Sequence, residues 1–300
     1  MKLGFIGLGR MGFNIVLNLK DHKVDVVAYN RSPEPTREIK KKKVDVAFSI
    51  DELMNKLPKQ KIIWIMVTAG KPVDEVMEEL LPYLNKNDIV IDGGNSFYKD
   101  SVKRYNYLKK KGINFVDIGT SGGLNGARHG ACLTIGGDKN LFKKIEPICK
   151  AVSAKNGYAY VGQAGAGHFV KMIHNGIEYA LLEAYGEGFE LLQKGPYKNL
   201  DLNKISATWK NGSIIKSYLI ELAEEAFKKD PKLSKIEGTI GGGETGEWTV
   251  KTAKDFNVDV GTIRLALDER KKSKKKPRFA GRFVAALRHQ FGGHEVVKRK

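Results

Sequence analysis

Four polar side chains recur in the segment 165–179 at spacings that suit proton chemistry. On an α-helix, where each residue turns by about 100°, Asn175 falls at about 40°, Glu178 at about 340° and His174 at about 300° from Lys171. One face would carry an amine, a carboxyl group, an imidazole and an amide. General base and general acid catalysis use such groups, so these four residues are the catalytic candidates. The alternative is a solvated face with an i,i+7 Lys/Glu pair.

Apolar residues of the same segment fall on the opposite side of that helix, between about 180° and 280°. They are Val170, Ile173, Ile177, Ala180 and Leu181. An amphipathic pattern of this kind predicts that the apolar side is buried in the protein. The polar face would then form one wall of a site.

A glycine-rich turn follows the first strand-like segment, residues 2–6. Gly7, Gly9 and Gly12 form G-x-G-x-x-G at the start of a helix. Such a turn lets a dinucleotide pyrophosphate approach the backbone at a helix N-terminus. The predicted cofactor contacts in this turn are Gly7, Leu8, Gly9, Arg10, Met11 and Gly12.

The end of the second strand-like segment, residues 24–29, bears on the choice of dinucleotide. An NAD site commonly has Asp or Glu there to bind the ribose 2′-hydroxyl. This chain has Asn30, Arg31 and Ser32, which offer hydrogen-bond donors and one positive charge. The sequence therefore favours NADP, with NAD as the weaker alternative. Arg31 as a turn residue that points to solvent is the other interpretation.

Strand-like and helical segments alternate in the first half of the chain, and helical segments dominate after residue 165. The predicted strands are 2–6, 24–29, 61–67, 88–92, 114–118 and 131–135; the later helices are 167–194, 202–209, 214–228, 248–256 and 279–291. This order predicts an α/β Rossmann-type, doubly wound parallel sheet followed by an all-α C-terminal domain. The predicted domains are 1–164, which binds the dinucleotide, and 165–300, which binds substrate and dimerises. The basic run 270–278 is predicted to be a mobile connector between helices.

The composition is that of a globular protein with an excess of basic residues. The formal net charge is +18, with 41% hydrophobic and 29% charged residues. The lysines are spread along the chain without interleaved aromatic residues, which favours a solvated surface, then steering of anionic small molecules, over nucleic-acid binding. Two cysteines, no signal-peptide pattern and an apolar run of only 62–69 predict a cytoplasmic protein without a membrane partner. No His, Cys, Asp or Glu cluster has metal-ligand spacing, so no metal is expected.

Together these motifs resemble the decarboxylating 6-phosphogluconate dehydrogenases, in the short form of that family. The segments that carry the resemblance are 7–12, 30–32, 66–70, 92–96, 121–123, 167–179 and 288–294. The resemblance covers nearly the whole chain.

The resemblance implies oxidative decarboxylation of 6-phospho-D-gluconate to D-ribulose 5-phosphate and CO2, a step of the pentose phosphate pathway, with reduction of NADP. It makes Lys171 the general base at the C3 hydroxyl and Glu178 the general acid, beside His174 and Asn175. It adds cofactor contacts at Val67, Thr68, Ala69 and Asn95. The implied substrate-binding residues are Asn95, Ser121, Gly122, Gly123, Tyr179, Arg270, Arg288 and His294.

The resemblance also implies a homodimer, because Arg288 and His294 match tail residues that reach the neighbouring subunit's site in longer relatives. One departure concerns the phosphate: Gly243 stands where the longer form has a phosphate-binding lysine. Two alternative functions remain. One is a 3-hydroxyacid dehydrogenase of the 3-hydroxyisobutyrate type, and the other is a non-catalytic NADP-binding regulator.

Overall fold

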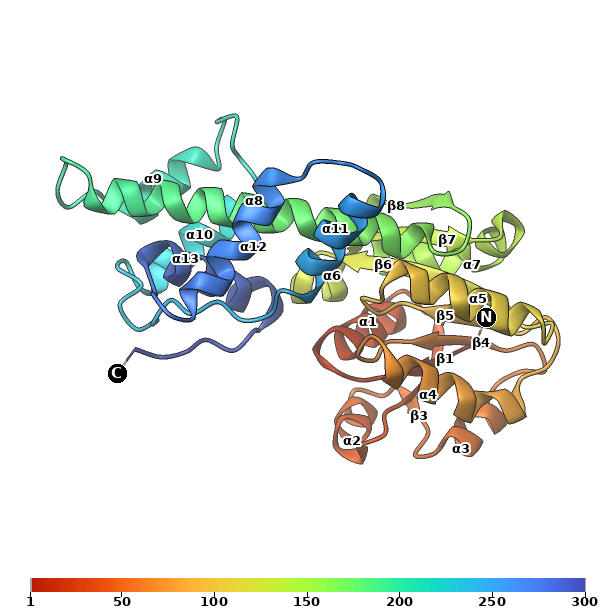
Figure 1. Cartoon of the computed structure of the whole chain (residues 1–300). Coiled ribbons are helices and arrows are strands. Elements are labelled where there is room, and N and C mark those ends of the chain that lie inside the picture. The colour runs from red at the N-terminus through yellow and green to blue at the C-terminus, as the bar shows by residue number, and fades with distance from the viewer. Residues whose placement is uncertain (1, 300) are drawn as a thin grey trace. The chain divides into compact units, whose positions relative to one another are not determined.

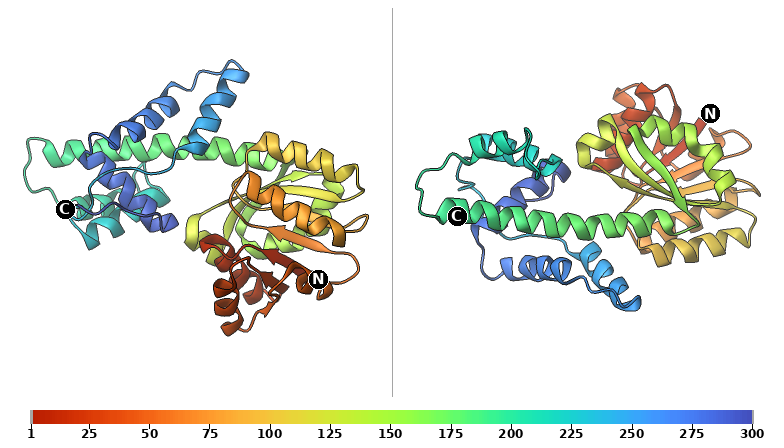
Figure 2. Two further views of the ribbon diagram at one scale, coloured as in Figure 1. Left: turned by 60° about the horizontal axis from the view of Figure 1, so that its bottom comes forward. Right: turned by 90° about the horizontal axis from the view of Figure 1, so that it is seen from above.

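The computed structural model describes residues 2–299 and divides into two compact units, residues 1–172 and 173–300 (Figures 1 and 2). The division falls inside one long helix, α8 (Ala166–Lys194), which begins in the first unit and continues into the second. The domain limits 1–164 and 165–300 therefore remain a prediction from the sequence. The two units are described separately below.

The first unit is built on one sheet with the strand order β3-β2-β1-β4-β5-β6-β7-β8. Strands β1 to β6 pair in parallel, β7 is antiparallel to β6, and β8 is parallel to β7. The strands are β1 (Lys2–Ile6), β2 (Asp25–Tyr29), β3 (Asp45–Val46), β4 (Ile62–Ile65), β5 (Ile89–Asp92), β6 (Asn114–Ser121), β7 (Ala131–Gly137) and β8 (Ser153–Gly162). The chain reverses its order across the sheet between β1 and β4, where doubly wound proteins bind nucleotides.

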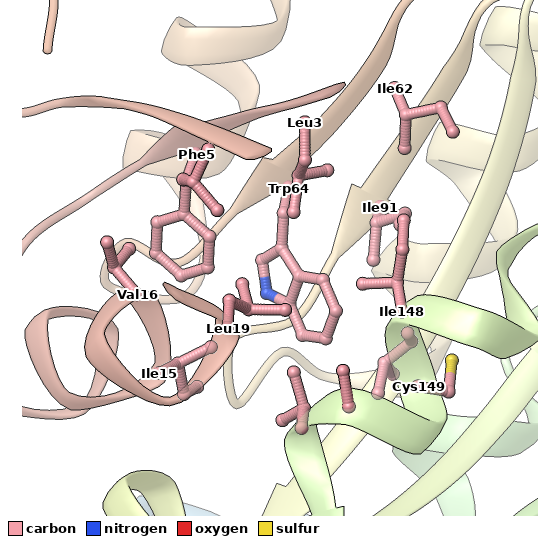
Figure 3. Packing of buried hydrophobic residues seen from close by; sticks show 14 of the residues in the cluster. Leu3, Phe5, Ile15, Val16, Leu19, Ile62, Trp64, Ile91, Ile148 and Cys149 are labelled. Atoms are coloured by element: carbon pink, nitrogen blue, oxygen red, sulfur yellow. The ribbon is translucent and has the colours of Figure 1, made fainter. Parts of the chain in front are cut away.

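Helices cover both faces of this sheet (Figure 2). They are α1 (Arg10–Asp21), α2 (Pro33–Lys41), α3 (Ile50–Asn55), α4 (Lys71–Leu80), the 3₁₀ turn η1 (Leu81–Tyr83), α5 (Tyr98–Lys109), α6 (Gly123–His129) and α7 (Lys139–Val152). Side chains of successive strand residues point to opposite faces, so each face has its own apolar core. On one face Phe5 and Trp64 stack at 6.0 Å and pack with Ile15 and Leu19 of α1 (Figure 3). The parallel strands are buried on both sides, as the predicted fold class requires.

The predicted fold class is confirmed, with differences in the sheet. The strand predicted at 131–135 exists as β7, but it pairs antiparallel with β6 rather than in parallel. The short strand β3 was not predicted, and neither was β8. Its sequence, Ser153–Gly162, is half exposed and lacks an apolar alternation. β8 forms because its backbone pairs with β7, although the register of this pairing shifts at two places. The side-chain pattern of β8 alone does not predict a strand.

The second unit is helical. Besides the larger part of α8 it contains α9 (Leu202–Trp209), α10 (Tyr218–Lys229), α11 (Glu244–Asp255), α12 (Gly261–Ser273) and α13 (Phe279–Gly292). Its core is aromatic: the Phe189 ring lies 5.1 Å from Phe227 and 4.9 Å from Phe283. Across residues 2–299, no helix is long and apolar enough to cross a membrane.

Helix α12 contradicts the prediction that residues 270–278 form a connector. The helix continues to Ser273, and only the residues between Ser273 and α13 join the two helices. Ala266, Leu267, Arg270 and Ser273 are buried along α12. The spacing i, i+1, i+4, i+7 is that of a helix face. The prediction was wrong because two of these four buried residues are polar and lie among lysines, which hides the period.

The apolar side of α8 is also placed differently from the prediction. Val170, Ile177 and Leu181 are 37%, 51% and 43% exposed. In the second unit the buried side of α8 includes Gly176 and Gly186 instead. A Cβ at Gly186 would lie 3.0 Å from the Ala280 carbonyl oxygen, and one at Gly176 would meet Thr249 at 2.7 Å. Close approach of α11 and α13 to these glycines, which the apolar pattern does not show, decides which side is buried.

Candidate functional site

The three glycines of the turn after β1 serve two different purposes. Gly7 has φ +104°, and a Cβ there would lie 2.4 Å from the Met66 carbonyl oxygen. A Cβ at Gly12 would lie 2.0 Å from the Gly7 carbonyl oxygen. The fold itself therefore requires these two glycines. A Cβ at Gly9 would meet nothing within 4 Å, so its missing side chain leaves an open surface at the start of α1. This surface fits a pyrophosphate that must come close to the backbone.

The electrostatics of the same turn also suit an anion. Helix α1 begins after Gly9 with no acidic residue in its first turn, so its amide groups and dipole carry the local positive charge. The loop after β4 lies beside the turn, because a Cβ at Gly7 would be 3.0 Å from Val67 Cγ1. The predicted contacts Thr68 and Ala69 follow in that loop. The residues present therefore fit a dinucleotide at the β1/β4 switch point.

Asn30 has a structural task in this arrangement. Its Oδ1 accepts a hydrogen bond from the Leu8 backbone N–H at 2.9 Å, and its Nδ2 donates to the Ser32 carbonyl oxygen at 3.0 Å. The amide thus ties the glycine turn to the end of β2. The exposed Arg31 remains as the charged side chain of the predicted 2′-phosphate site.

A buried ion cluster holds the loops after β4 and β5. The carboxylate of Asp92 is fully buried and accepts hydrogen bonds from Gly94 N–H (3.2 Å), Ser96 Oγ (2.8 Å) and Arg104 Nη1 (3.2 Å). Arg104 also donates to the Gly70 carbonyl oxygen in the β4 loop at 3.0 Å. The loop that carries the predicted site residue Asn95 is therefore fixed on the loop that carries the predicted cofactor contacts.

The first turn of α8 is fastened to the middle of the sheet. Asp117 of β6, fully buried, accepts hydrogen bonds from the N–H groups of Gly165 (2.7 Å) and His168 (2.8 Å). A Cβ at Gly119 would lie only 2.4 Å from Lys171 Cβ. Lys171 is thus pressed against β6, the strand that ends at Ser121 and leads into the predicted substrate-binding glycines Gly122 and Gly123.

In the second unit, three of the predicted catalytic residues contact one another on α8. His174 Nδ1 lies 3.9 Å from Glu178 Oε2 and 3.3 Å from Asn175 Oδ1. Asn175 is 9% exposed, whereas the side chain of His174 is 46% exposed. Three of the four polar side chains predicted to share one face of this helix therefore lie together, with the imidazole open to solvent.

The predicted phosphate residues Tyr179 and Arg270 also meet. The guanidinium carbon of Arg270 lies 3.7 Å from the centroid of the Tyr179 ring, in cation–π geometry. Arg270 is 3% exposed, and its Nη1 has no hydrogen-bond partner within residues 2–299. Burial lowers the pKa of Arg270, while Tyr179 and Glu178 oppose that effect. The buried guanidinium of Arg270 is thus held with one of its two terminal nitrogens, Nη1, not hydrogen-bonded.

Arg288 of α13 joins this cluster in the same chain. Burial, together with the nearby positive charge of Arg270, lowers the pKa of Arg288 to about 10. Its Nη2 lies 3.1 Å from where a Cβ of Gly242 would be, so the glycine segment borders the guanidinium. Arg270 is buried and Arg288 is half-buried, and two neighbouring cations of this kind cost free energy unless an anion joins them. His294 packs instead against Phe291 in the tail, with ring centroids 6.0 Å apart.

Sequence reasoning missed Thr245. Its Oγ1 lies 2.9 Å from the hydroxyl oxygen of Tyr179, and a Cβ at the next residue, Gly246, would meet the Tyr179 ring at 2.5 Å. The N-terminal turn of α11 (Glu244–Asp255) therefore faces the arginine cluster. The signal was present in the segment 241–248, where Gly243 had been noted only for lacking the family lysine.

Comparison with known proteins agrees with this geometry. The family model described as the NAD binding domain of 6-phosphogluconate dehydrogenase matches residues 2–162, and the model of the 6-phosphogluconate dehydrogenase C-terminal domain matches residues 167–297. The chain belongs to the 6-phosphogluconate dehydrogenase family. The resemblance predicted from the motifs is therefore confirmed.

Two relatives match over the full chain, and a third matches over 89% of it. The protein YqeC of Bacillus subtilis is 43% identical, and the match covers 100% of both chains. The NAD(+)-dependent, decarboxylating 6-phosphogluconate dehydrogenase of Haloferax volcanii is 42% identical over 100% of this chain and 99% of its own length. The decarboxylating 6-phosphogluconate dehydrogenase of Candida albicans is 41% identical, but only 55% of it is covered. The chain thus has the length of the shorter family members.

Solved structures show the same fold. A Plasmodium falciparum 6-phosphogluconate dehydrogenase, studied in its apo form and with NADP+ or 6-phosphogluconate, matches with TM-score 0.84 and 33% identity over 92% of this chain and 62% of its own. A 3-hydroxyisobutyrate dehydrogenase from Salmonella typhimurium matches with TM-score 0.76 and 16% identity over 94% of this chain and 99% of its own. The second likeness shows the fold alone.

Proposed function

We propose that this protein oxidises and decarboxylates 6-phospho-D-gluconate to D-ribulose 5-phosphate and CO2, with NADP as electron acceptor. The observation that carries the proposal is the pair of the buried Arg270, which has an unpartnered guanidinium nitrogen, and the half-buried Arg288. Arg270 lies over the ring of Tyr179. Such a pair of arginines suits a dianion such as a phosphomonoester. A 3-hydroxyisobutyrate-type substrate carries no phosphate, and its carboxylate alone would leave one of the two cations without a counter-charge.

Lys171 acts as the general base in the proposed mechanism. A dinucleotide held by the glycine turn after β1 would supply the acceptor for a hydride from C3 of the substrate. The neutral amine of Lys171 takes the proton of the C3 hydroxyl as that hydride leaves, and C3 becomes a ketone. The contact of Lys171 with β6 holds its stem in place during this step. The bond from C2 to the carboxylate then breaks, because the new ketone accepts its electron pair. The ammonium group of Lys171 returns its proton to the C3 oxygen, and CO2 and an enediol result.

Glu178 acts as the general acid that completes the reaction. A carboxyl group of Glu178 protonates the enediol at the carbon that becomes C1 of ribulose 5-phosphate. Glu178 follows Lys171 by two helical turns, about 10 Å along α8, so the two groups address different carbons of one sugar chain. His174, 3.9 Å from Glu178, and Asn175 would bind the hydroxyl groups nearest to the reacting carbons.

The remaining contacts follow from the two ends of the substrate. Asn95 and the segment 121–123 would bind the carboxylate and hydroxyl end. Tyr179, Arg270, Arg288 and Thr245 would bind the phosphate, with Thr245 as our addition. His294 stays a substrate-binding candidate from the family resemblance. Together these groups replace the lysine that is absent at Gly243.

For the cofactor we propose NADP, with NAD as a weaker alternative. Support comes from Arg31 and Ser32 at the end of β2, where no carboxylate would repel a 2′-phosphate. The relative from Haloferax volcanii is named as NAD(+)-dependent, so the preference rests on this chain's own residues. Asn30 fixes the turn for either dinucleotide.

We further propose a homodimer. The exposed apolar residues Ile177, Leu181 and Leu191 follow one another on one side of α8 and are 51%, 43% and 73% exposed. An exposed apolar stripe of this kind is typical of a protein interface. The family resemblance assigned Arg288 to the neighbouring subunit's site. Because Arg288 lies beside Arg270 of its own chain, we propose that it acts within its own subunit.

The test is the absorbance at 340 nm with 6-phosphogluconate or gluconate, using NADP and NAD in parallel, while CO2 is trapped. We expect reduction of the dinucleotide with one CO2 released per turnover. The kcat/KM for 6-phosphogluconate should be at least about 30-fold higher than that for gluconate. Lys171→Met is expected to lower kcat by about 10²–10⁴-fold, and Glu178→Gln is expected to slow product formation strongly. Oxidation of 3-hydroxyisobutyrate but not of 6-phosphogluconate would contradict the proposal, and so would dinucleotide binding without turnover.

A further inference from the structure

We propose that His168 is a positioning residue, which couples the loop that carries Asn95 to the helix turn that carries Lys171. This inference rests on the proposed function. The His168 side chain is 1% exposed and lies three residues before Lys171 in α8. Its Nε2 lies 3.1 Å from the Gly94 carbonyl oxygen, and its Nδ1 lies 2.7 Å from Ser101 Oγ. One side chain thus joins α8, the loop after β5 and helix α5.

The partners of the ring fix its tautomer. A carbonyl oxygen only accepts hydrogen bonds, so Nε2 carries the hydrogen that is shared with Gly94. In the neutral ring Nδ1 then accepts from the hydroxyl of Ser101, which is fully buried. The backbone N–H of His168 donates to Asp117 at 2.8 Å. With its main chain fixed to β6 and its ring fixed to α5, His168 presents one N–H in a set direction.

The atom that receives this N–H decides where Asn95 points. The Gly94 carbonyl belongs to the peptide group that joins Gly94 to Asn95, and that group is planar. Two other bonds hold the preceding part of the loop, from Gly94 N–H to Asp92 (3.2 Å) and from Thr120 Oγ1 to the Gly93 carbonyl oxygen (3.3 Å). The bond from His168 holds the peptide group that follows Gly94, a residue whose backbone dihedral angles are less restricted than those of other residues. Without it the peptide plane can turn, and Asn95 shifts relative to Lys171.

The coupling predicts a loss in kcat rather than in cofactor binding. A displacement of about 1 Å between reacting groups costs about 10²-fold in rate. We expect His168→Leu to lower kcat by about 10- to 100-fold, with the KM for NADP within about twofold of the wild type. His168→Gln places an amide N–H near the position of Nε2, and we expect it to retain kcat within about fivefold.

A matched control is Asn18→Leu in the same unit. Asn18 is 2% exposed, and its Nδ2 donates to the Val152 carbonyl oxygen at 3.0 Å, so this change also removes one buried hydrogen bond to a backbone carbonyl. It touches neither the Asn95 loop nor α8. We expect its kcat to stay within about twofold of the wild type. Equal losses of kcat in Asn18→Leu and His168→Leu would overturn the proposal, because general destabilisation would then explain both.

Amide hydrogen exchange measures how firmly His168 holds the loop that carries Asn95, and it needs no enzymatic turnover. We expect amide exchange in residues 93–97 to accelerate at least about tenfold in His168→Leu and to stay unchanged in Asn18→Leu. If His168→Leu fails to fold, His168→Gln takes its place, and slow exchange in 93–97 with retained kcat supports the proposal. Unchanged exchange in His168→Leu, or fast exchange in a folded His168→Gln, overturns it. A wild type inactive on 6-phosphogluconate contradicts the proposed function alone, because the exchange result still decides the coupling.

Discussion

Replacement of Arg270 by methionine separates binding from stability more clearly than any other single change. Methionine keeps an unbranched apolar stem against the Tyr179 ring and removes the guanidinium. Arg270 is 3% exposed and has a nitrogen without a hydrogen-bond partner, beside the second cation Arg288. The change therefore removes a guanidinium that lowers the stability of the free protein and strengthens the binding of a phosphate.

The magnitudes follow from these contacts. A buried donor without a partner costs about 1–3 kcal/mol, and the cation–π contact with Tyr179 is worth about 0.5–2 kcal/mol. The two terms oppose each other, so the variant should lie between about 1 kcal/mol less stable and about 2.5 kcal/mol more stable than the wild type. Loss of one charged partner of a buried phosphate should weaken binding by at least about 2 kcal/mol, which is about 30-fold.

Steady-state kinetics and thermal unfolding measure the two quantities. We expect the KM for 6-phosphogluconate to rise at least about 30-fold in Arg270→Met, with a smaller change in kcat, because phosphate binding is the same in ground and transition states. Arg282→Met is the control, since Arg282 of α13 also has a buried nitrogen without a partner but is not among the proposed substrate contacts. A KM within twofold of the wild type, or destabilisation by more than about 2 kcal/mol, would refute this reasoning.

Three further predictions concern other parts of the chain. Arg31→Ala should lower kcat/KM for NADP at least about tenfold and leave that for NAD within twofold; equal changes for both cofactors would remove Arg31 as the 2′-phosphate contact. Mixed dimers of Lys171→Ala and Arg288→Ala chains should stay as inactive as the separate variants if Arg288 serves its own subunit, whereas recovery of activity on mixing would show that it serves the neighbour. Burial and the nearby Glu187 raise the pKa of Glu183 from 4.5 to about 7 against the opposing effect of Arg278. The folded state then holds the proton to higher pH than the unfolded state, so stability falls as pH rises from about 4.5 to about 7, by up to about 3 kcal/mol. Glu183→Gln should match the wild type in unfolding free energy at pH 5 and exceed it at pH 8, and an equal difference at both pH values would contradict this assignment.

The sequence was most informative where chemistry depends on residue type at fixed spacing. The glycine turn, the polar face of α8 and the pair Tyr179/Arg270 were all predictable, because each lies in a short segment or in a recognisable motif. Thr245 was missed because a lone threonine at a helix start has an ordinary structural use as well.

Other features were unpredictable for physical reasons. The buried face of α12 includes Arg270 and Ser273, so its period is not apolar and the segment was mistaken for a connector. Ile177 and Leu181 of α8 were predicted to be buried, because the prediction assumed that apolar residues are covered by other residues of the same chain. Asn30 stays a predicted cofactor contact, and the bonds of its amide to Leu8 and Ser32 could not be predicted from its place after a strand.

The glycine turn and the arginine pair support a ligand by the same reasoning. At Gly7 and Gly12 the fold explains the missing side chain, and at Gly9 it does not. Among residues 2–299 the buried arginines are Arg104 and Arg270. Arg104 is matched by Asp92 and Asp74, whereas Arg270 keeps a nitrogen without a hydrogen-bond partner. At Arg270 a buried nitrogen lacks a hydrogen-bond partner, and at Gly9 the backbone is left open, and no contact within the protein accounts for either feature. A pyrophosphate at Gly9 and a phosphomonoester at Arg270 would each supply the missing partner, which is why both features are better evidence of function than the motifs that contain them.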